Sequence, residues 1–518
     1  MTSSPPTTWA DAFRVELERL VDTGYPIARQ GGQALGEHAR REQREFLSSL
    51  PPGYVEETPP ELAARDWLEI LILQASEQAE QHNDNGDLVD GLSGESSEGP
   101  SYEGEYGHFV VDPWPGTAHE DFRLRRSGLR RLELSTLLPV LESFGLAVVE
   151  AVPWHFVLGP AGPGFYVDDI GLRARTPGME LGFDLSGAGG RLVQAIEAVL
   201  SGDAELNVLN RLVLSADLTW HEVNLLCAYR AYRQAVGGPR AIERAALMGD
   251  SLVMFPSVAA AVIKLFYDLL VPAPPYAPGP HDVAADHDGG ARATVLDALS
   301  RVPDLAHHEV LSELLSLVEA TTRSNWALKR GPVALKFASA SVHFLPAPKP
   351  TSEIFVWTPW FHGLHLRFGA VARGGIRWSE RQRDLRTEVL GLARAQVKKN
   401  SLIVPTGAKG AFVLRDLSAS PDQARDAYAI FVVSLLQLTD NIVDGKIVHP
   451  SGIWCRDGED PYLVVAPDKG TATFSDLANA ISNKAGFWLG DAFASGGSNG
   501  YDHKALGITA KGSWLAVG

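Results

Sequence analysis

Cationic side chains and glycines are concentrated in one stretch, residues 372–410. It contains Arg373 and two glycines in ARGGIRWSE, then Gln396 and Lys399 near the end of a predicted helix, and finally PTGAKG. Glycines allow a backbone to approach a ligand closely. Several cations near such turns would suit a dicarboxylate substrate, and a solvated basic surface is the competing explanation.

Lys409 fits the solvated-surface explanation poorly. It lies in PTGAKG, which we predict to be a glycine-rich turn between the short strands 402–404 and 411–414. Burial and neighbouring cations both lower the pKa of a lysine, which lets its amine act as a base near neutral pH. Lys409 is therefore a candidate catalytic residue.

Asp468 is the candidate carboxylate. It follows the apolar segment 462–466, predicted to be a strand, and chemistry in open α/β sheets gathers at the carboxyl ends of strands. The competing role is a helix cap. Ser475 precedes the helical pattern 476–482 and could provide that cap instead.

Ser498 lies in a second short pattern, since residues 496–500 match G-x-S-x-G. A nucleophile elbow requires a strand before the serine and a helix after it. The preceding segment, 486–494, is instead predicted to be helical. A serine hydrolase using Ser498 is thus an alternative, and a glycine-rich loop is favoured.

Composition excludes several classes of protein. The chain has 518 residues, 45% of them hydrophobic, with a net charge of −17. This charge argues against nucleic-acid binding and against a polybasic membrane anchor. Its two cysteines permit neither a disulfide framework nor a cysteine-cluster zinc site, so we expect no metal. Without a signal or membrane-spanning pattern, a cytoplasmic protein is expected.

The order of patterns predicts a multidomain α/β protein, with a helical N-terminal region, a small α/β unit and an open α/β sheet. The predicted divisions are a helical region 1–78, an acidic flexible linker 79–119, an α/β unit 120–185, a helical domain 186–271, a Pro/Gly linker 272–292, a helical connection 293–350 and an α/β domain 351–518.

Long runs of residues carry a family resemblance. VARGGIRWSERQRDLRTEVLGLARAQVKKNSLIVPTGAKGAFV (371–413), LTDNIVDGKIVHP (438–450) and much of 457–514 resemble the large bacterial NAD-specific glutamate dehydrogenases. Weaker similarity in 138–172 is to an ACT-like unit, and in 209–234 to a helical segment of that family. The resemblance implies a glutamate dehydrogenase substrate domain from residue 351 onward.

The resemblance also implies roles for individual residues. Lys409 and Asp468 would be the catalytic lysine and aspartate. The substrate-binding residues would be Arg373, Gly374, Gly375, Gln396 and Lys399, with arginine at position 373 where the family motif has lysine. Thr509 would lie near the nicotinamide of NAD.

The implied reaction is oxidative deamination of L-glutamate to 2-oxoglutarate and ammonium, with NAD as cofactor. The resemblance further implies a homo-oligomer. No G-x-G-x-x-G follows a predicted strand, so the NAD-binding domain is expected to lie beyond residue 518, and the isolated chain is expected to be inactive. A non-catalytic remnant that binds ligands or pairs with other subunits is the other alternative.

Overall fold

The computed structural model describes residues 8–23, 32–80, 106–112, 120–157, 164–175, 185–238, 240–271, 290–329, 331–400, 406–499 and 506–517. Side chains are described for most of these, but not for residues 32–36, 75–80, 112, 185–188, 397–400, 508, 509, 513, 516 and 517. The chain divides into two compact units, an N-terminal unit (1–202) and a C-terminal unit (203–518).

The N-terminal unit begins with helices, as predicted. These are α1 (Trp9–Asp22), α2 (Gly32–Ser48), the short α3 (Tyr54–Glu57) and α4 (Pro60–Glu80). Aromatic side chains form their core: Phe46 stacks on Trp67 at 5.1 Å and on Phe156 of the following sheet at 5.5 Å between ring centroids. The helices and the sheet therefore share one hydrophobic core.

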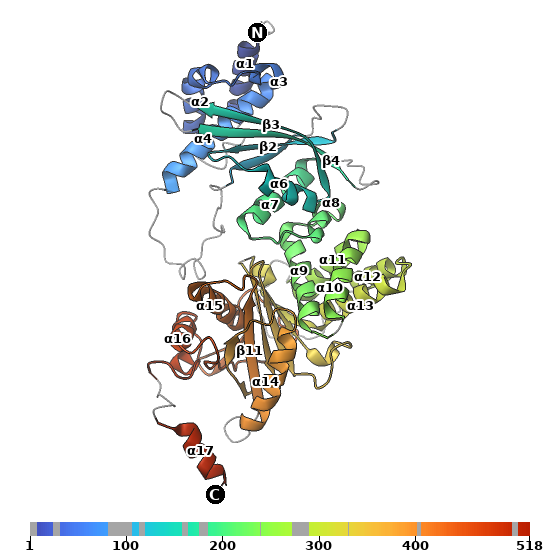
Figure 1. Cartoon of the computed structure of the whole chain (residues 1–518), viewed down its shortest axis with the longest axis vertical. Coiled ribbons are helices and arrows are strands. Elements are labelled where there is room, and N and C mark those ends of the chain that lie inside the picture. The colour runs from blue at the N-terminus through green and yellow to red at the C-terminus, as the bar shows by residue number, and fades with distance from the viewer. Residues whose placement is uncertain are drawn as a thin grey trace. The chain divides into compact units, whose positions relative to one another are not determined.

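A four-stranded antiparallel sheet completes the N-terminal unit (Figure 1). It has the order β1-β2-β4-β3 and is accompanied by two helices. The elements are β1 (His108–Asp112), β2 (Phe122–Gly128), α6 (Leu134–Ser143), β3 (Leu146–Val157), β4 (Gly164–Ala174) and α7 (Leu185–Ser201). β1 lies inside the range 79–119 that we predicted to be a linker, because its residues His108–Asp112 pair with β2. The remainder of that range, 81–105 and 113–119, lies outside the described residues.

A buried ionic chain joins α4 to this sheet. Arg125 of β2 donates to Asp66 of α4 at 2.9 and 2.5 Å and to Asp169 of β4 at 2.7 Å. Asp66 also accepts from the Tyr54 hydroxyl. Buried charges are tolerated only when paired in this way, and polarity patterns along the sequence do not reveal such pairs.

The C-terminal unit opens with helices: η2 (Val208–Arg211), α8 (Leu212–Ser215), α9 (Trp220–Ala235), α10 (Ala241–Met254), α11 (Pro256–Leu270), α12 (Gly290–Ser300) and α13 (Leu305–Ala320). Thr219 and Glu222 form a capping box at the start of α9. Of the predicted linker 272–292, residues 272–289 lie outside the described part of the chain, and α12 begins at Gly290. No single helix among the described residues is long and apolar enough to cross a membrane, although α10 and α11, bent by 101°, pass that test as a pair.

A mixed sheet follows these helices and confirms the predicted α/β class. Its path is β10-β11-β8-β7-β6-β5, and β9 also pairs with β11. The strands are β5 (Thr321–Ser324), β6 (Val333–Phe337), β7 (Ser352–Trp357), β8 (Phe361–Arg367), β9 (Ala372–Arg373), β10 (Ile376–Trp378) and β11 (Thr406–Leu414). β5 and β6 lie in the range 293–350 that we predicted to be a helical connection, so the sheet begins earlier than expected. Among the described strands of this sheet, β9 and β10 run parallel to β11 and the other pairs are antiparallel.

Helices α14 (Leu385–Asn400) and α15 (Pro421–Gln437) cover opposite faces of this sheet (Figure 1). Gly363 of β8 faces Phe431 of α15, whereas Glu353 of β7 pairs with Arg386 of α14. The short 3₁₀ helices η3 (Trp326–Leu328) and η4 (Ser339–Ser341) lie between strands of the sheet. After α15 come the hairpin β12 (Asn441–Val443) and β13 (Lys446–Val448), then α16 (Ser475–Lys484), η5 (Gly490–Ala492) and α17 (Ile508–Val517). Residues of α15, α16 and the sheet form one hydrophobic core.

Candidate active site

Lys409 is the fourth residue of β11, a nine-residue strand. The predicted turn at PTGAKG is therefore wrong over residues 406–410, which form the first half of this strand, while residues 402–404 lie outside the described chain. β11 pairs with β8 on one side and with β9 and β10 on the other. Because both edges are paired, the glycines serve close packing between strands and not a reversal of the chain. The Lys409 side chain is buried, with 7% of the residue exposed.

Sheet register places Lys409 on the face covered by α14. Lys409 is opposite Leu366, which is opposite Glu353, and directly opposed residues of antiparallel strands share a face. Glu353 in turn accepts from Arg386 of α14. The amine therefore lies on the same side of the sheet as the helix that contains Gln396.

Asp468 meets Lys409 directly, since the lysine Nζ donates to its Oδ2. The two residues are 59 positions apart in sequence, and both were predicted to be catalytic. The preceding segment 462–466 is not the continuous strand we predicted, because it forms only isolated bridges, one of them between Val464 and Arg373. A further bridge pairs Pro467 with Ile376 of β10 and so holds Asp468 beside the sheet.

The backbone of Asp468 is held by Thr471. The Asp468 amide donates to the Thr471 hydroxyl at 3.1 Å, and that hydroxyl donates to the carbonyl of Ile376 at 2.7 Å. The predicted capping role of Ser475 is not found, because its hydroxyl donates to the carbonyl of Ser495 and the cap position of α16 is Phe474.

Gly374 and Gly375 form the link between β9 and β10 and pass against the lysine strand. A Cβ atom on Gly374 would overlap the Ala408 carbonyl. The carbonyl of Gly375 accepts from the Gly410 amide at 3.0 Å, and a Cβ on Gly375 would lie 3.3 Å from the Cβ of Asp468. The two glycines therefore allow the loop, the lysine strand and the aspartate to converge.

The other predicted substrate-binding residues are placed less completely. Arg373 ends β9 and is partly exposed, and Gln396 is a partly exposed residue of α14. Lys399 and Thr509 belong to α14 and α17, but their side chains lie outside the described residues. The structure thus brings Lys409, Asp468, Gly374 and Gly375 together, and the remaining assignments stay predictions.

Three polar side chains, one beside Asp468 and two linked to it through that residue, were not predicted as site residues. Arg377 of β10 lies 3.4 Å from Asp468 and donates to Glu388 of α14 at 3.1 Å. Glu388 also accepts from the Ser379 hydroxyl at 2.5 Å. Arg377 belongs to the motif that we singled out, so its position was available, but nothing in the spacing of Glu388 distinguishes it from an ordinary charge on a helix.

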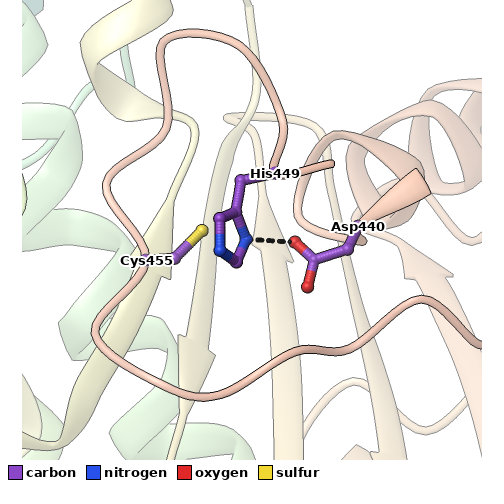
Figure 2. Close-up of side chains that lie close together, drawn as sticks. All are labelled: Asp440, His449 and Cys455. Atoms are coloured by element: carbon purple, nitrogen blue, oxygen red, sulfur yellow. Dashed lines mark hydrogen bonds and ion pairs between the residues drawn. The ribbon is translucent and has the colours of Figure 1, made fainter. Parts of the chain in front are cut away.

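The opposite face of the sheet carries a second polar group, Asp440, His449 and Cys455 (Figure 2). Their potential ligand atoms lie within 4.8 Å of one another, so we asked whether they could hold a metal ion. The Asp440 carboxylate already accepts from Arg323 at 2.6 and 3.1 Å, from His449 at 2.8 Å and from the Asp460 amide at 2.6 Å. Burial raises the pKa of Cys455 to about 11, which keeps the thiol protonated.

This group fits an ionic network better than a metal centre. The same face holds Arg367 and Lys336, both paired with Asp460. Although burial alone would raise it, the pKa of Asp460 is held well below its usual value by those two cations. Asp457 pairs with both Arg323 and Lys336, so three carboxylates already match these three cations. A divalent cation would add unbalanced positive charge, and we assign a structural role to Asp440 and Arg323.

Ser498 lacks the surroundings of a hydrolase nucleophile in this structure. Its hydroxyl and amide both donate to Asp476 of α16, at 3.0 and 2.7 Å, so the hydroxyl is paired with a carboxylate instead of an imidazole. The preceding element is the single 3₁₀ turn η5 and not a strand. The helix predicted over 486–494 is reduced to that turn.

Comparison with known proteins matches the sequence of this chain to one class, the glutamate dehydrogenases. Residues 294–518 match the family model described as bacterial NAD-glutamate dehydrogenase, catalytic domain. Residues 204–272 match glutamate dehydrogenase helical motif 3, and residues 116–184 match the glutamate dehydrogenase ACT3 domain. The C-terminal sheet with Lys409 and Asp468 is thus a catalytic domain of the glutamate dehydrogenase type.

Several relatives are similar to this chain in sequence. NAD-specific glutamate dehydrogenases from Pseudomonas aeruginosa and Halomonas elongata are 42% and 39% identical over 398 residues, which is 74% of this chain and 24% of each relative. The enzyme of that name from Mycobacterium tuberculosis is 41% identical over 411 residues, 75% of this chain and 25% of the relative. The chain belongs to the family of large bacterial NAD-specific glutamate dehydrogenases, and it spans about a quarter of the length of these relatives.

Proposed function

We propose that this chain provides the substrate-side catalytic groups of an NAD-dependent glutamate dehydrogenase, which converts L-glutamate to 2-oxoglutarate and ammonium. The observation that carries the proposal is the contact between the buried amine of Lys409 and Asp468, beside a glycine loop that packs closely against both residues. An amine and a carboxylate in contact can exchange protons with each other and with a substrate bound beside them. The family membership of the chain supports this interpretation.

Substrate binding is assigned to the cationic and amide side chains on the α14 side of the sheet. We propose that Gln396 and Lys399 bind the α-carboxylate of glutamate and that Arg373 binds its other carboxylate. An arginine offers two parallel donors to a carboxylate, so its replacement by lysine would keep the charge but alter the geometry of binding. Because Lys399 is proposed to bind a carboxylate and not to transfer protons, Lys399→Ala should raise the KM for glutamate more than it lowers kcat.

Proton transfer is assigned to the central pair. After the Cα of glutamate has lost its hydride, the neutral Lys409 amine would take a proton from the water that attacks the resulting iminium carbon. Asp468 would carry protons to and from that nitrogen as the amino group leaves as ammonium. Groups positioned in this way typically contribute about 10²–10⁴-fold each to the rate.

NAD would accept the hydride, and we assign none of the described residues to a contact with NAD. Among them, no glycine-rich turn leads from a parallel strand into a helix, which is the element that binds a dinucleotide pyrophosphate. We also propose that the enzyme is a cytoplasmic homo-oligomer. Residues 120–185 would form an ACT-like unit, and residues 351–518 would form the substrate domain.

The test is an assay of NADH formation with the polypeptide expressed from its natural reading frame. L-glutamate and NAD should give NADH, and Lys409→Ala or Asp468→Asn should lower kcat by about 10²–10⁴-fold while the thermal midpoint changes little. Lys446→Ala, which removes an exposed lysine of β13, is the matched control and should retain full activity. Unaltered turnover in Lys409→Ala would refute the assignment.

The same assay separates the alternatives. A non-catalytic protein would form no NADH in any variant but could still bind 2-oxoglutarate in calorimetry. A serine hydrolase would be labelled by a fluorophosphonate at Ser498, which the contact of that hydroxyl with Asp476 argues against.

A further inference from the structure

Two cations, Lys409 and Arg377, contact the Asp468 carboxylate, and they differ in whether they can lose a proton. Lys409 donates to it from β11, and Arg377 reaches it from β10, with Nη2 at 3.4 Å from Oδ1 and Nε at 3.4 Å from Oδ2. A lysine can lose its proton within the accessible pH range, whereas an arginine remains charged. The proposed reaction requires Lys409 to be neutral for part of each cycle, and at that moment only Arg377 of these two would still balance the charge of Asp468.

Arg377 is itself held in place. Its Nη1 donates to Glu388 of α14 at 3.1 Å, and Glu388 accepts from the Ser379 hydroxyl at 2.5 Å. Ser379 is buried, and its amide donates to the carbonyl of Phe412 in β11 at 2.9 Å. The guanidinium is therefore fixed between a helix and the strand that carries Lys409.

We propose that Arg377, oriented by Glu388 and Ser379, is a positioning residue that keeps Asp468 ionised and correctly oriented while Lys409 changes its protonation state. This inference rests on the proposed function of the Lys409–Asp468 pair. It assigns Arg377 no contact with the substrate, and so distinguishes it from Arg373, which lies on the same loop but is proposed to bind a carboxylate.

The pH dependence of turnover would test this inference most specifically. The charged groups around the Asp468 carboxylate are Lys409 from β11, Arg377 from β10, Glu388 of α14 behind Arg377, and the adjacent Lys469, whose amine lies 3.9 Å from Glu380. An opposite charge within about 4–6 Å lowers a carboxyl pKa by about 1–3 units. Removing Arg377 should raise the pKa of Asp468, so the acid side of the kcat profile should move to higher pH.

The experiment measures kcat and KM against pH for Arg377→Gln and Arg377→Lys in the naturally expressed polypeptide. Arg377→Gln should lower kcat about 10- to 100-fold, leave the KM for glutamate within about threefold, and move the acid limb by about one pH unit or more. Arg377→Lys should return the acid limb of the kcat profile most of the way to its wild-type position. Arg381→Gln, an exposed arginine paired with Asp384, is the matched control and should leave the profile unchanged.

A second variant tests the support of the guanidinium. Glu388→Gln retains the Arg377 charge but weakens its anchor, so it should lower kcat with a smaller shift of the acid limb. An unchanged kcat and profile in Arg377→Gln would overturn the inference, and so would a large rise in KM alone. Because wild type and Lys409→Ala are assayed in parallel, an inactive wild type would instead indicate failure of the proposed function.

Discussion

The Cα of Gly374 lies so close to the carbonyl oxygen of Ala408 that a single added methyl group would overlap it. Ala408 directly precedes Lys409 in β11. The loop between β9 and β10 can therefore follow the lysine strand only if residue 374 has no side chain. This contact, together with the pairing of Gly375 and Gly410, determines how near the loop comes to the reacting groups.

Gly374→Ala should therefore disrupt the site through the backbone. The overlapping partner is a main-chain atom of a central strand, which cannot rotate away, so the loop must move. We expect a loss of stability of about 1–3 kcal/mol and a fall in activity of more than about tenfold. Calorimetry and the NADH assay measure these effects. Gly391→Ala, at an open position on α14, is the matched control and should raise the thermal midpoint slightly; equal behaviour of the two variants would contradict this account.

The buried pair of Arg386 and Glu353 allows a prediction about stability. Both side chains are almost fully buried, and Arg386 donates to Glu353 at 2.8 and 2.5 Å. Arg386→Met would leave Glu353 charged and unbalanced inside the protein, which typically costs about 3–5 kcal/mol. The double variant with Glu353→Met should recover much of this loss. Thermal unfolding of the four members of the cycle tests the coupling.

Arg381→Met provides the control for that cycle. Its partner Asp384 is exposed, and exposed pairs contribute about 0–1 kcal/mol. Losses of stability of similar size in Arg386→Met and Arg381→Met would show that burial does not determine how much an ion pair contributes to stability.

Glu69 makes the stability of the N-terminal unit depend on pH. Burial, aided by the carboxylates of Asp66 and Glu197, raises the pKa of Glu69 from 4.5 to about 7. The folded unit therefore binds a proton between these values that the unfolded chain releases. The stabilisation from this proton is complete below pH 4.5 and is lost as pH rises through about 7, a change on the order of 3 kcal/mol.

Glu69→Gln should remove this loss, because its amide carries no charge at any of these pH values. The variant should unfold at a higher temperature than wild type above pH 7 and should differ little near pH 5. Glu56→Gln, at an exposed position, is the control and should follow wild type throughout. Parallel pH profiles for wild type and Glu69→Gln would show that Glu69 is ionised in the folded unit.

Apolar patterning predicted the helices between residues 186 and 271 correctly, because their buried apolar positions carry the signal, as in α9 and α11. It failed where pairing partners decide the structure. PTGAKG has the composition of a turn, but strands on both sides hold residues 406–410 in β11. The segment 462–466 has the composition of a strand and yet forms only single bridges.

The candidate site was predictable in part. Lys409 and Asp468 were identified as separate candidates, and their contact depends on β10 and on the chain at Pro467, which spacing does not reveal. Glu388 and the buried carboxylates that pair with Arg323 were not predicted. A charged residue that is neutralised by a partner distant in sequence resembles a solvated surface charge until the fold is known.

The tight passage of Gly374 over Ala408 has a consequence for how such chains diverge. The requirement at position 374 is steric and concerns whether the strands can assemble, whereas the requirement at position 409 is chemical and concerns turnover alone. In a descendant that no longer performs the reaction, the lysine would be free to change while the glycine would still be required for folding. Aligned relatives that lack Lys409 but retain Gly374 would thus mark lineages in which catalysis was lost and the architecture was kept.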